Sequence, residues 1–267
     1  MQSDSIPQVM GILNITPDSF SDGGELMTRD AVATRIMQMI DAGVAIFDVG
    51  GESTRPFAGQ VTEQEELDRV LPVIELIREV TDLPVSVDTT KAGVAAAALR
   101  AGADMLNDIS GLRRDEKMIE VARGFAGPVV VMHMQGTPDT MQIAPRYQDV
   151  AGEICEFFRE RIELLTGAGI EKERIILDPG IGFGKTVEHN LEILRHIRTF
   201  KQLGHRLLIG HSRKSFLGGV LGLEKGRRDC ATAVISFYCA GEGADIIRVH
   251  DVELTRQAVR LSAAIGA

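Results

Sequence analysis

The sequence predicts an α/β fold, a (β/α)8 TIM barrel that occupies residues 1–267 as a single domain. Three observations lead to this prediction. Short apolar runs alternate with amphipathic segments from end to end, no Pro/Gly/Ser-rich linker interrupts them, and polar residues gather where the apolar runs stop. Eight such units without a second domain favour a closed barrel over an open sheet, because closure removes both edge strands.

Eight strands are expected, each followed by a helical pattern. They should begin near Val9, Ala45, Val85, Met105, Val129, Ile175, Leu207 and Asp245. The second helix has a capping box formed by Thr62 and Glu65. Its apolar stripe contains Leu67, Leu71, Ile74 and Ile77. Glycines mark predicted helix-to-strand returns at Gly43, Gly102, Gly169 and Gly243.

Composition narrows the class of protein. The net charge of -9 argues against nucleic acid and anionic membranes as partners, because both are bound through basic surfaces. No run approaches the ~18 apolar residues of a membrane helix, and the polar start lacks a secretion signal, which predicts a cytoplasmic protein. Cys155, Cys230 and Cys239 show no metal-binding spacing, so we interpret them as buried small hydrophobes in a reducing compartment.

Carboxylates stand at the ends of apolar strands, as in Ile46-Phe47-Asp48, Val85-Ser86-Val87-Asp88 and Ile175-Ile176-Leu177-Asp178. A buried charge without a partner costs several kcal/mol, so each must meet a partner in the protein or a ligand from solution. With Asn107 at the fourth strand end, Asp88 and Asp178 provide the acceptors that a donor-rich heterocycle such as an aminopyrimidinone requires. The alternative is that each carboxylate is an internal salt-bridge partner.

Cationic and hydroxyl side chains occupy other strand ends. Thr54 and Arg55 follow Gly50-Gly51 and suit phosphate oxygens. A surface arginine is the alternative, but the position at the functional end of a barrel strand favours phosphate. Alternation places Arg248 and His250 on the same side of the eighth strand. An anionic ligand is one explanation for these cations, and neutralisation of the inward carboxylates is the other.

Two motifs resemble known catalytic loops without matching them. Gly182-Phe183-Gly184-Lys185-Thr186 resembles a P-loop, but Pro179 stands where its first glycine belongs. Gly210-His211-Ser212-Arg213-Lys214 begins like a nucleophile elbow, but Lys214 replaces the closing glycine. Nucleotide hydrolysis and serine hydrolysis are therefore disfavoured. The lone His133 is interpreted as a supporting residue and not as a catalytic one.

The long polar loop after Asn14 suggests a lid, with capping of its own loop by Asn14 as the alternative. This loop, Asn14-Ile15-Thr16-Pro17-Asp18-Ser19-Phe20-Ser21-Asp22-Gly23-Gly24, resembles a signature segment of the pterin-binding enzymes, and within them of the bacterial dihydropteroate synthases. The resemblance runs from about Met10 to Thr255. It includes Asp48 to Pro56, Leu177-Asp178-Pro179-Gly180, Ser212-Arg213-Lys214-Ser215 and Arg248-Val249-His250-Asp251, in the order of the family. His211 departs from it, because members of the family mostly carry a small or apolar residue there.

The resemblance implies an enzyme that joins 6-hydroxymethyl-7,8-dihydropterin diphosphate to 4-aminobenzoate and releases diphosphate. It implies that Asp88, Asn107, Asp178 and Lys214 hold the pterin while Arg248 stacks on it. It further implies that Asn14 binds Mg2+, that Thr54, Arg55, Arg248 and His250 face the diphosphate, and that Phe20, Pro56, Phe183 and Ser215 border the aminobenzoate pocket. Asp88, Asp178, Lys214 and Arg248 form the expected catalytic set, and a homodimer is the usual assembly of the family.

Two alternatives of other kinds remain. A barrel could bind pterin without synthase activity. A folate-dependent methyl transferase on the same fold is disfavoured, because Lys214 and His250, read as cations, suit a leaving diphosphate that methyl transfer does not have.

Overall fold

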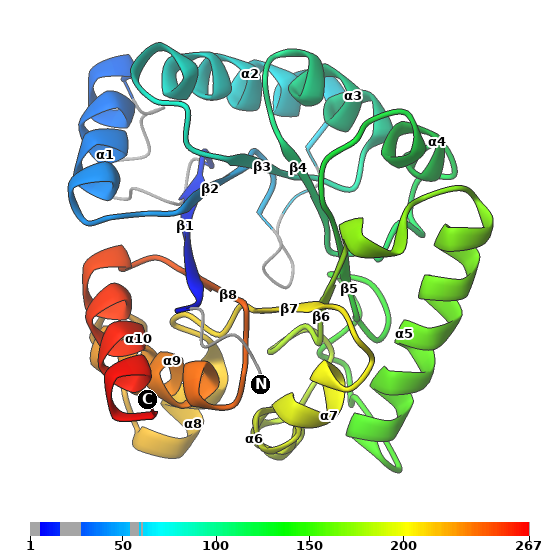
Figure 1. Ribbon diagram of the computed structural model, residues 1–267, viewed down its shortest axis with the longest axis vertical. Helices are drawn as coiled ribbons and strands as arrows, with labels where there is room; N and C mark the ends of the chain where they lie inside the picture. The colour runs from blue at the N-terminus through cyan, green and yellow to red at the C-terminus, as the bar shows by residue number, and fades with distance from the viewer. Residues whose placement is uncertain (1–5, 17–27, 54–58, 60, 267) are drawn as a thin grey trace.

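Eight parallel strands close into a barrel in sequence order in the computed structural model, which describes residues 6–16, 28–53, 59 and 61–266 (Figure 1). The strands are β1 Gln8–Asn14, β2 Ile46–Gly50, β3 Val85–Asp88, β4 Met105–Asp108, β5 Val129–Met132, β6 Ile175–Asp178, β7 Arg206–Ile209 and β8 Ile246–Val249. Each begins within one residue of its predicted start. The predicted (β/α)8 TIM barrel is confirmed.

Helices form a ring outside the strands (Figure 1). They are α1 Arg29–Asp41, α2 Glu63–Val80, α3 Ala92–Arg100, α4 Met118–Arg123, α5 Val150–Gly167, α6 Val187–Arg195, α7 Ile197–Lys201, α8 Ser215–Leu221, α9 Asp229–Gly241 and α10 Val252–Gly266. Two helices follow β6 and two follow β7, where the sequence predicted one unit each. Among the described helices, none combines the length and apolar character needed to cross a membrane.

The barrel interior is layered, because side chains alternate along each strand with a period of two residues. The lower layer is apolar and consists of Met10, Ile46, Met105, Val130, Ile176, Leu208 and Ile246. Two residues further along four of these strands, the inward side chains are Asp48, Asn107, Asp178 and Arg248. The same alternation therefore places an apolar plug at the bottom of the barrel and polar groups near its carboxyl-terminal mouth.

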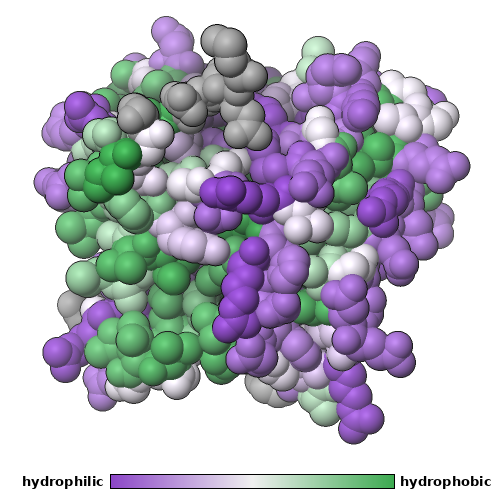
Figure 2. Space-filling view, turned by 60° about the horizontal axis from the view of Figure 1, so that its bottom comes forward, coloured by the Kyte–Doolittle hydropathy of each residue, from purple (hydrophilic) through white to green (hydrophobic). Residues whose placement is uncertain are grey.

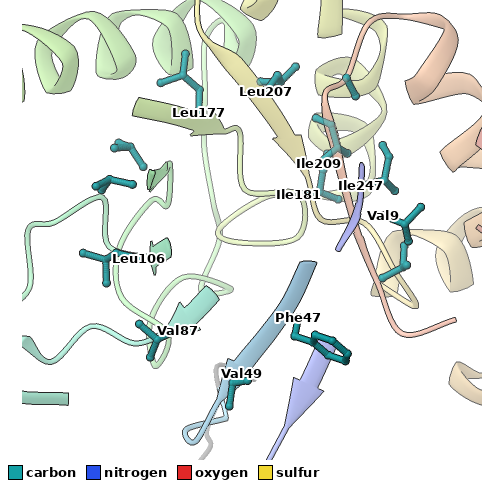
Figure 3. Close-up of a cluster of buried hydrophobic side chains, with 14 of the residues drawn as sticks. Val9, Phe47, Val49, Val87, Leu106, Leu177, Ile181, Leu207, Ile209 and Ile247 are labelled. Atoms are coloured by element: carbon teal, nitrogen blue, oxygen red, sulfur yellow. The ribbon is translucent and has the colours of Figure 1, made fainter. Parts of the chain in front are cut away.

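The outer faces of the strands form the main core against the helices. Figure 3 shows Phe47, Val49, Val87 and Leu106 projecting from consecutive strands on this side. All four are fully buried. This continuous apolar layer fixes the strands, and with them the positions of the residues at the mouth.

Local details of the prediction are partly corrected. The Thr62–Glu65 capping box is present, and the predicted return glycines all have positive φ angles. The buried stripe of α2 includes Val70, Ile74 and Ile77, whereas Leu67 and Leu71 flank it half-buried. All three cysteines are free, but Cys230 is exposed at the start of α9, so the prediction that it is a buried hydrophobe was wrong.

Candidate active site

Four of the predicted site residues meet at the barrel mouth. Asp88, Asn107, Asp178 and Arg248 all lie at the carboxyl ends of their strands with inward side chains, which parallel pairing brings to one edge. A Cβ atom at Gly210 would lie 3.8 Å from Arg248 and 3.9 Å from the Asp178 carboxylate. The absence of a side chain at Gly210 therefore leaves space between these two groups.

Arg248 is the centre of a buried charge cluster. Its Nε donates to Asp48 Oδ2 at 2.5 Å, and its Nη2 donates to Asp88 Oδ2 at 2.6 Å. Asn107 Nδ2 donates to Asp48 Oδ1 at 3.3 Å. Burial raises the pKa of Asp88 to about 7, although Arg248 opposes that rise.

This cluster bears on the two explanations of the inward charges. Arg248 forms ion pairs with both Asp48 and Asp88, so each of these carboxylates has an internal salt-bridge partner, and a ligand role for Asp88 stays a prediction. Asp48 was recognised as a strand-end carboxylate but was not assigned to the site. Its inward position, two residues after Ile46, was the available signal.

Asp178 is held by the turn that follows it. The N–H of Gly180 donates to Asp178 Oδ1 at 2.7 Å, and His133 N donates to the Asp178 carbonyl at 2.9 Å. Burial raises the pKa of Asp178, while the Gly180 hydrogen bond and the positive charge of Lys214 lower it. The turn requires glycine, because Gly180 has a φ of +67° and a Cβ there would lie 2.0 Å from the carbonyl oxygen of His133.

Replacing Gly180 with alanine should therefore lower the free energy of unfolding and also displace Asp178. The matched control is Gly222→Ala, which has the same φ of +67° but no atom within 4 Å of the added Cβ. The backbone conformation alone should cost about 1–2 kcal/mol in both variants. Urea unfolding should show a larger loss for Gly180→Ala, and equal losses in the two variants would contradict the role of the His133 carbonyl.

Lys214 lies at the start of α8, against the turn that carries Phe183. Its Nζ donates to the carbonyl of Ile181 at 2.7 Å and lies 3.9 Å from the centre of the Phe183 ring. Burial lowers the pKa of Lys214 to about 7, against the opposing effect of Asp178. Lys214 is thus a cation that gives up its proton easily, beside an aromatic wall.

His250 is fixed but not cationic. Its Nδ1 lies 2.9 Å from Ser212 Oγ, and burial together with Arg213 and Arg248 lowers its pKa to about 3. The prediction that His250 is a cation was wrong, because it is neutral near pH 7. Arg213 turns to Asp229 and forms hydrogen bonds of 2.6 and 2.8 Å with it. Of the two residues whose positive charge was taken to disfavour methyl transfer, only Lys214 can be a cation near pH 7.

Asn14, Phe183 and Ser215 line one cavity of about 590 Å³ with Lys214 and His250. Asn14 stands at the carboxyl end of β1, so its side chain lies on the wall of this cavity. Asp88 borders a second cavity of about 400 Å³ with Ile109 and Met134. Four predicted residues, Phe20, Thr54, Arg55 and Pro56, lie outside the described residues, as does the predicted lid beyond Thr16.

His211, the one departure from the family pattern, is fully buried beneath the Lys214 loop. Its Nε2 lies 3.0 Å from the Thr232 carbonyl and 3.1 Å from Ser236 Oγ, both on α9. Burial lowers its pKa to about 4, so it is neutral near pH 7. It attaches the loop to α9.

The fold and the mouth define a (β/α)8-barrel protein with a polar ligand site at the carboxyl ends of its strands. The pterin binding enzyme family matches residues 10–250. The chain belongs to the pterin binding enzyme family.

Individual relatives agree with this assignment. A dihydropteroate synthase of Synechocystis sp. is 45% identical over 258 residues, which cover 96% of this chain and 89% of the relative. A crystal structure of the Yersinia pestis dihydropteroate synthase with a sulfonamide drug complex matches with a TM-score of 0.94 and 44% identity, covering 98% and 95% of the two chains. The Xanthomonas albilineans dihydropteroate synthase with 4-aminobenzoic acid has a TM-score of 0.92 and 42% identity, covering 99% and 94%.

Proposed function

We propose that the protein is a dihydropteroate synthase. It would condense 6-hydroxymethyl-7,8-dihydropterin diphosphate with 4-aminobenzoate to give 7,8-dihydropteroate and diphosphate. The observation that carries this proposal is the pairing of buried acceptors at the barrel mouth with a cavity that combines Lys214, Arg248 and His250. Relatives of the same name, at 45% identity over nearly the whole chain, support it.

The residues divide into two sets by chemistry. Asp88, Asn107 and Asp178 accept and donate hydrogen bonds at the edge of the pterin, and a site built to pair such groups discriminates strongly against analogues that lack them. Arg248 forms ion pairs with Asp48 and Asp88, so its guanidinium lies beside the proposed pterin site. The pterin is thereby bound beside carboxylates that stabilise positive charge on its ring.

The leaving group faces the other set. The C–O bond to diphosphate breaks before the amine of 4-aminobenzoate attacks, so negative charge develops on the diphosphate and positive charge on the pterin. Lys214 and Arg248 stabilise the diphosphate as cations, and His250 as a neutral hydrogen-bond donor. An aromatic amine is a weak nucleophile, and orientation against Phe183 and Ser215 can supply roughly 7–11 kcal/mol of the barrier reduction.

We also propose Mg2+ as the cofactor, held by Asn14 and the diphosphate oxygens. The described residues contain no cluster of three His, Cys, Asp or Glu side chains that could hold a metal by itself. This suits Mg2+, which commonly uses one or two protein oxygens with substrate phosphates and water. When bound, the ion would neutralise charge that develops on the leaving group.

The test mixes both substrates with and without Mg2+ and measures diphosphate release and 7,8-dihydropteroate formation. Wild type should form both products in equal amounts, and Asp178→Asn should bind the pterin substrate at least ~10-fold more weakly, because a charged acceptor is lost. A wild type that binds pterin in calorimetry but releases no diphosphate would establish the alternative, a pterin-binding barrel without synthase activity.

We further propose a homodimer in the cytoplasm, with two small-molecule substrates and neither nucleic acid nor membrane as partner. Three free cysteines agree with a reducing compartment. Of the thirteen exposed large hydrophobic residues in the described part of the chain, seven lie on α8, α9 and α10. They are Val220, Leu221, Val234, Tyr238, Leu254, Leu261 and Ile265. Figure 2 shows hydrophobic colour gathered on the lower left of this face, the side on which Figure 1 places these helices. A second copy of the chain would cover this apolar surface.

Replacing Val234 with aspartate should therefore shift the sedimentation of the protein from dimer to monomer. Val234 is 62% exposed, and a buried charge at an apolar interface is costly. The matched control is Ile143→Asp, which is 68% exposed and lies between β5 and α5. Wild type that sediments as a monomer at micromolar concentration would refute the homodimer.

A further inference from the structure

Lys185 is a buried lysine that lies just outside the cavity with Lys214. Its side chain follows the Gly180–Gly184 turn and is only 3% exposed. Its Nζ donates to the Phe183 carbonyl at 2.8 Å and to the His133 carbonyl at 3.3 Å, and lies 3.1 Å from His133 Nδ1. All three acceptors are uncharged. A buried lysine normally has a carboxylate partner, so this one requires an explanation.

The contacts of Lys185 join two strand ends. His133 follows β5 and Phe183 follows β6, so the single ammonium group ties the two loops together. His133 N in turn donates to the carbonyl of Asp178 at 2.9 Å. The turn is held from its other side as well, because Asn190 Oδ1 accepts from Gly182 N at 2.6 Å and Tyr147 Oη donates to the Gly184 carbonyl at 3.0 Å.

The other face of the same turn contacts the active site. Ile181 presents its carbonyl to Lys214 Nζ at 2.7 Å, and Phe183 places its ring 3.9 Å from that nitrogen. The turn is therefore a thin layer with one lysine on each side: Lys185 fixes it from within the protein, and Lys214 rests on it within the cavity.

We propose that Lys185, with His133, is a positioning residue that sets where the Gly180–Gly184 turn presents Phe183 and Lys214 to the substrates, and whose charge tunes the proton affinity of Lys214. This inference rests on the proposed function for its kinetic consequence alone. Its structural and electrostatic parts concern the protein without substrate.

The charges around Lys185 and Lys214 support the proposed effect of Lys185 on the proton affinity of Lys214. The titratable groups that face Lys185 are His133, Asp178 and Lys214. Burial lowers the pKa of Lys185 to about 7, with Asp178 opposing and Lys214 contributing to the decrease. Burial, together with the positive charges of Lys185 and Arg113, lowers the pKa of His133 to about 2, so this imidazole is a neutral acceptor. Asp178 favours the charged form of both lysines, while Asp88 raises and Arg248 lowers the pKa of Lys214. Because the repulsion between two positive charges is mutual, Lys185 and Lys214 each make the proton of the other less stable.

Two variants separate geometry from charge. Lys185→Met removes the hydrogen bonds and the charge, whereas Lys185→Gln removes the charge but retains an N–H donor for the Phe183 and His133 carbonyls. Lys117→Met, at an exposed position before α4, is the control for loss of a lysine. Neither position contributes a side chain to the cavity that contains Lys214.

The first measurement needs no turnover. The rate at which acetic anhydride acetylates Lys214, followed by peptide mass spectrometry across a pH series, reports the pKa of Lys214. That pKa should rise by about 0.5 unit or more in both Lys185 variants, because a neighbouring positive charge is lost, and should not move in Lys117→Met. An unchanged pKa of Lys214 in both Lys185 variants would overturn the electrostatic part, whether or not the protein is a synthase.

The second measurement is kcat and KM for both substrates. Lys185→Met should lower kcat by ~10²-fold, as expected for a displaced reacting geometry, and Lys185→Gln should recover most of this loss. If the melting temperature of Lys185→Met is far below that of wild type, kcat is compared between Lys185→Gln and wild type instead. Wild-type kcat in a folded Lys185→Met would overturn the positioning role. An inactive wild type would instead refute the proposed function and leave the acetylation result to decide the electrostatic part.

Discussion

Replacement of Arg248 with methionine is expected to lower the free energy of unfolding by about 3–5 kcal/mol, because it leaves a buried ion pair without its cation. Asp48 is fully buried, and Arg248 is its only described salt-bridge partner. Asp88 would lose the same partner. Urea unfolding followed by circular dichroism measures this loss. The comparison is Arg195→Met, since Arg195 is an exposed partner of two glutamates and should contribute less than about 1 kcal/mol.

A second substitution identifies the origin of the loss. In the double variant Arg248→Met/Asp48→Asn, the buried carboxylate that lost its partner is neutral, so part of the stability should return. Synthase activity should not return with it, because Arg248 is proposed to act on the substrate. A loss below 1 kcal/mol for Arg248→Met would show that the cluster is solvated and that Arg248 is retained for ligand binding alone.

Replacement of Lys214 with methionine is expected to lower kcat/KM by ~10²–10³-fold, the range observed when one group that stabilises developing charge is removed. It should also change the pH profile. The pKa of Lys214 is lowered to about 7, so its ammonium is present below that pH and is lost as the pH rises. In wild type, kcat/KM should therefore fall above about pH 7, and this decline should be absent from the residual activity of Lys214→Met.

The stability of the protein should move in the opposite direction over the same range. A lysine with a pKa of about 7 when folded and about 10.5 when unfolded binds fewer protons in the folded state between these values. Unfolding then takes up protons, so the contribution of Lys214 to stability increases as the pH rises from about 7 to about 10.5. Wild-type kcat/KM that stays constant from pH 6 to pH 9 would contradict the lowered pKa of Lys214 in the free enzyme.

The fold and the gathering of polar residues at the strand ends could be predicted because both depend on local pattern. An apolar residue followed two positions later by a polar one, as in Ile176 and Asp178, indicates a strand whose inner face changes from core to site. The same pattern recurs at several strand ends. Because parallel strands bring these ends to one edge of the barrel, the polar groups were expected to lie together. Glycine at the returns and a capping box at Thr62 are likewise signals within a few residues.

The rest of the site depends on contacts between distant segments. Arg248 meets Asp48 because barrel closure places β8 two strands from β2, a separation of 200 residues along the chain. The neutrality of His250 follows from burial beside Arg213 and Arg248, which no local motif encodes. Lys185 lies in a motif that resembles a P-loop in sequence, and no local pattern indicates its contact with His133.

The alternation of side chains along the barrel strands links loss of the ligand site to unfolding of the barrel. The hydrogen-bond ladder that aligns Met10 with Ile46 also aligns Ile12 with Asp48, and the ladder that aligns β8 with β1 pairs Met10 with Arg248. Slippage of a strand by one residue would turn its plug and pocket side chains outward, toward the helices, and bring its outer-face side chains into the barrel. Heating should therefore abolish pterin affinity and far-ultraviolet ellipticity in one cooperative step, with no populated species that retains the barrel but has lost its ligand.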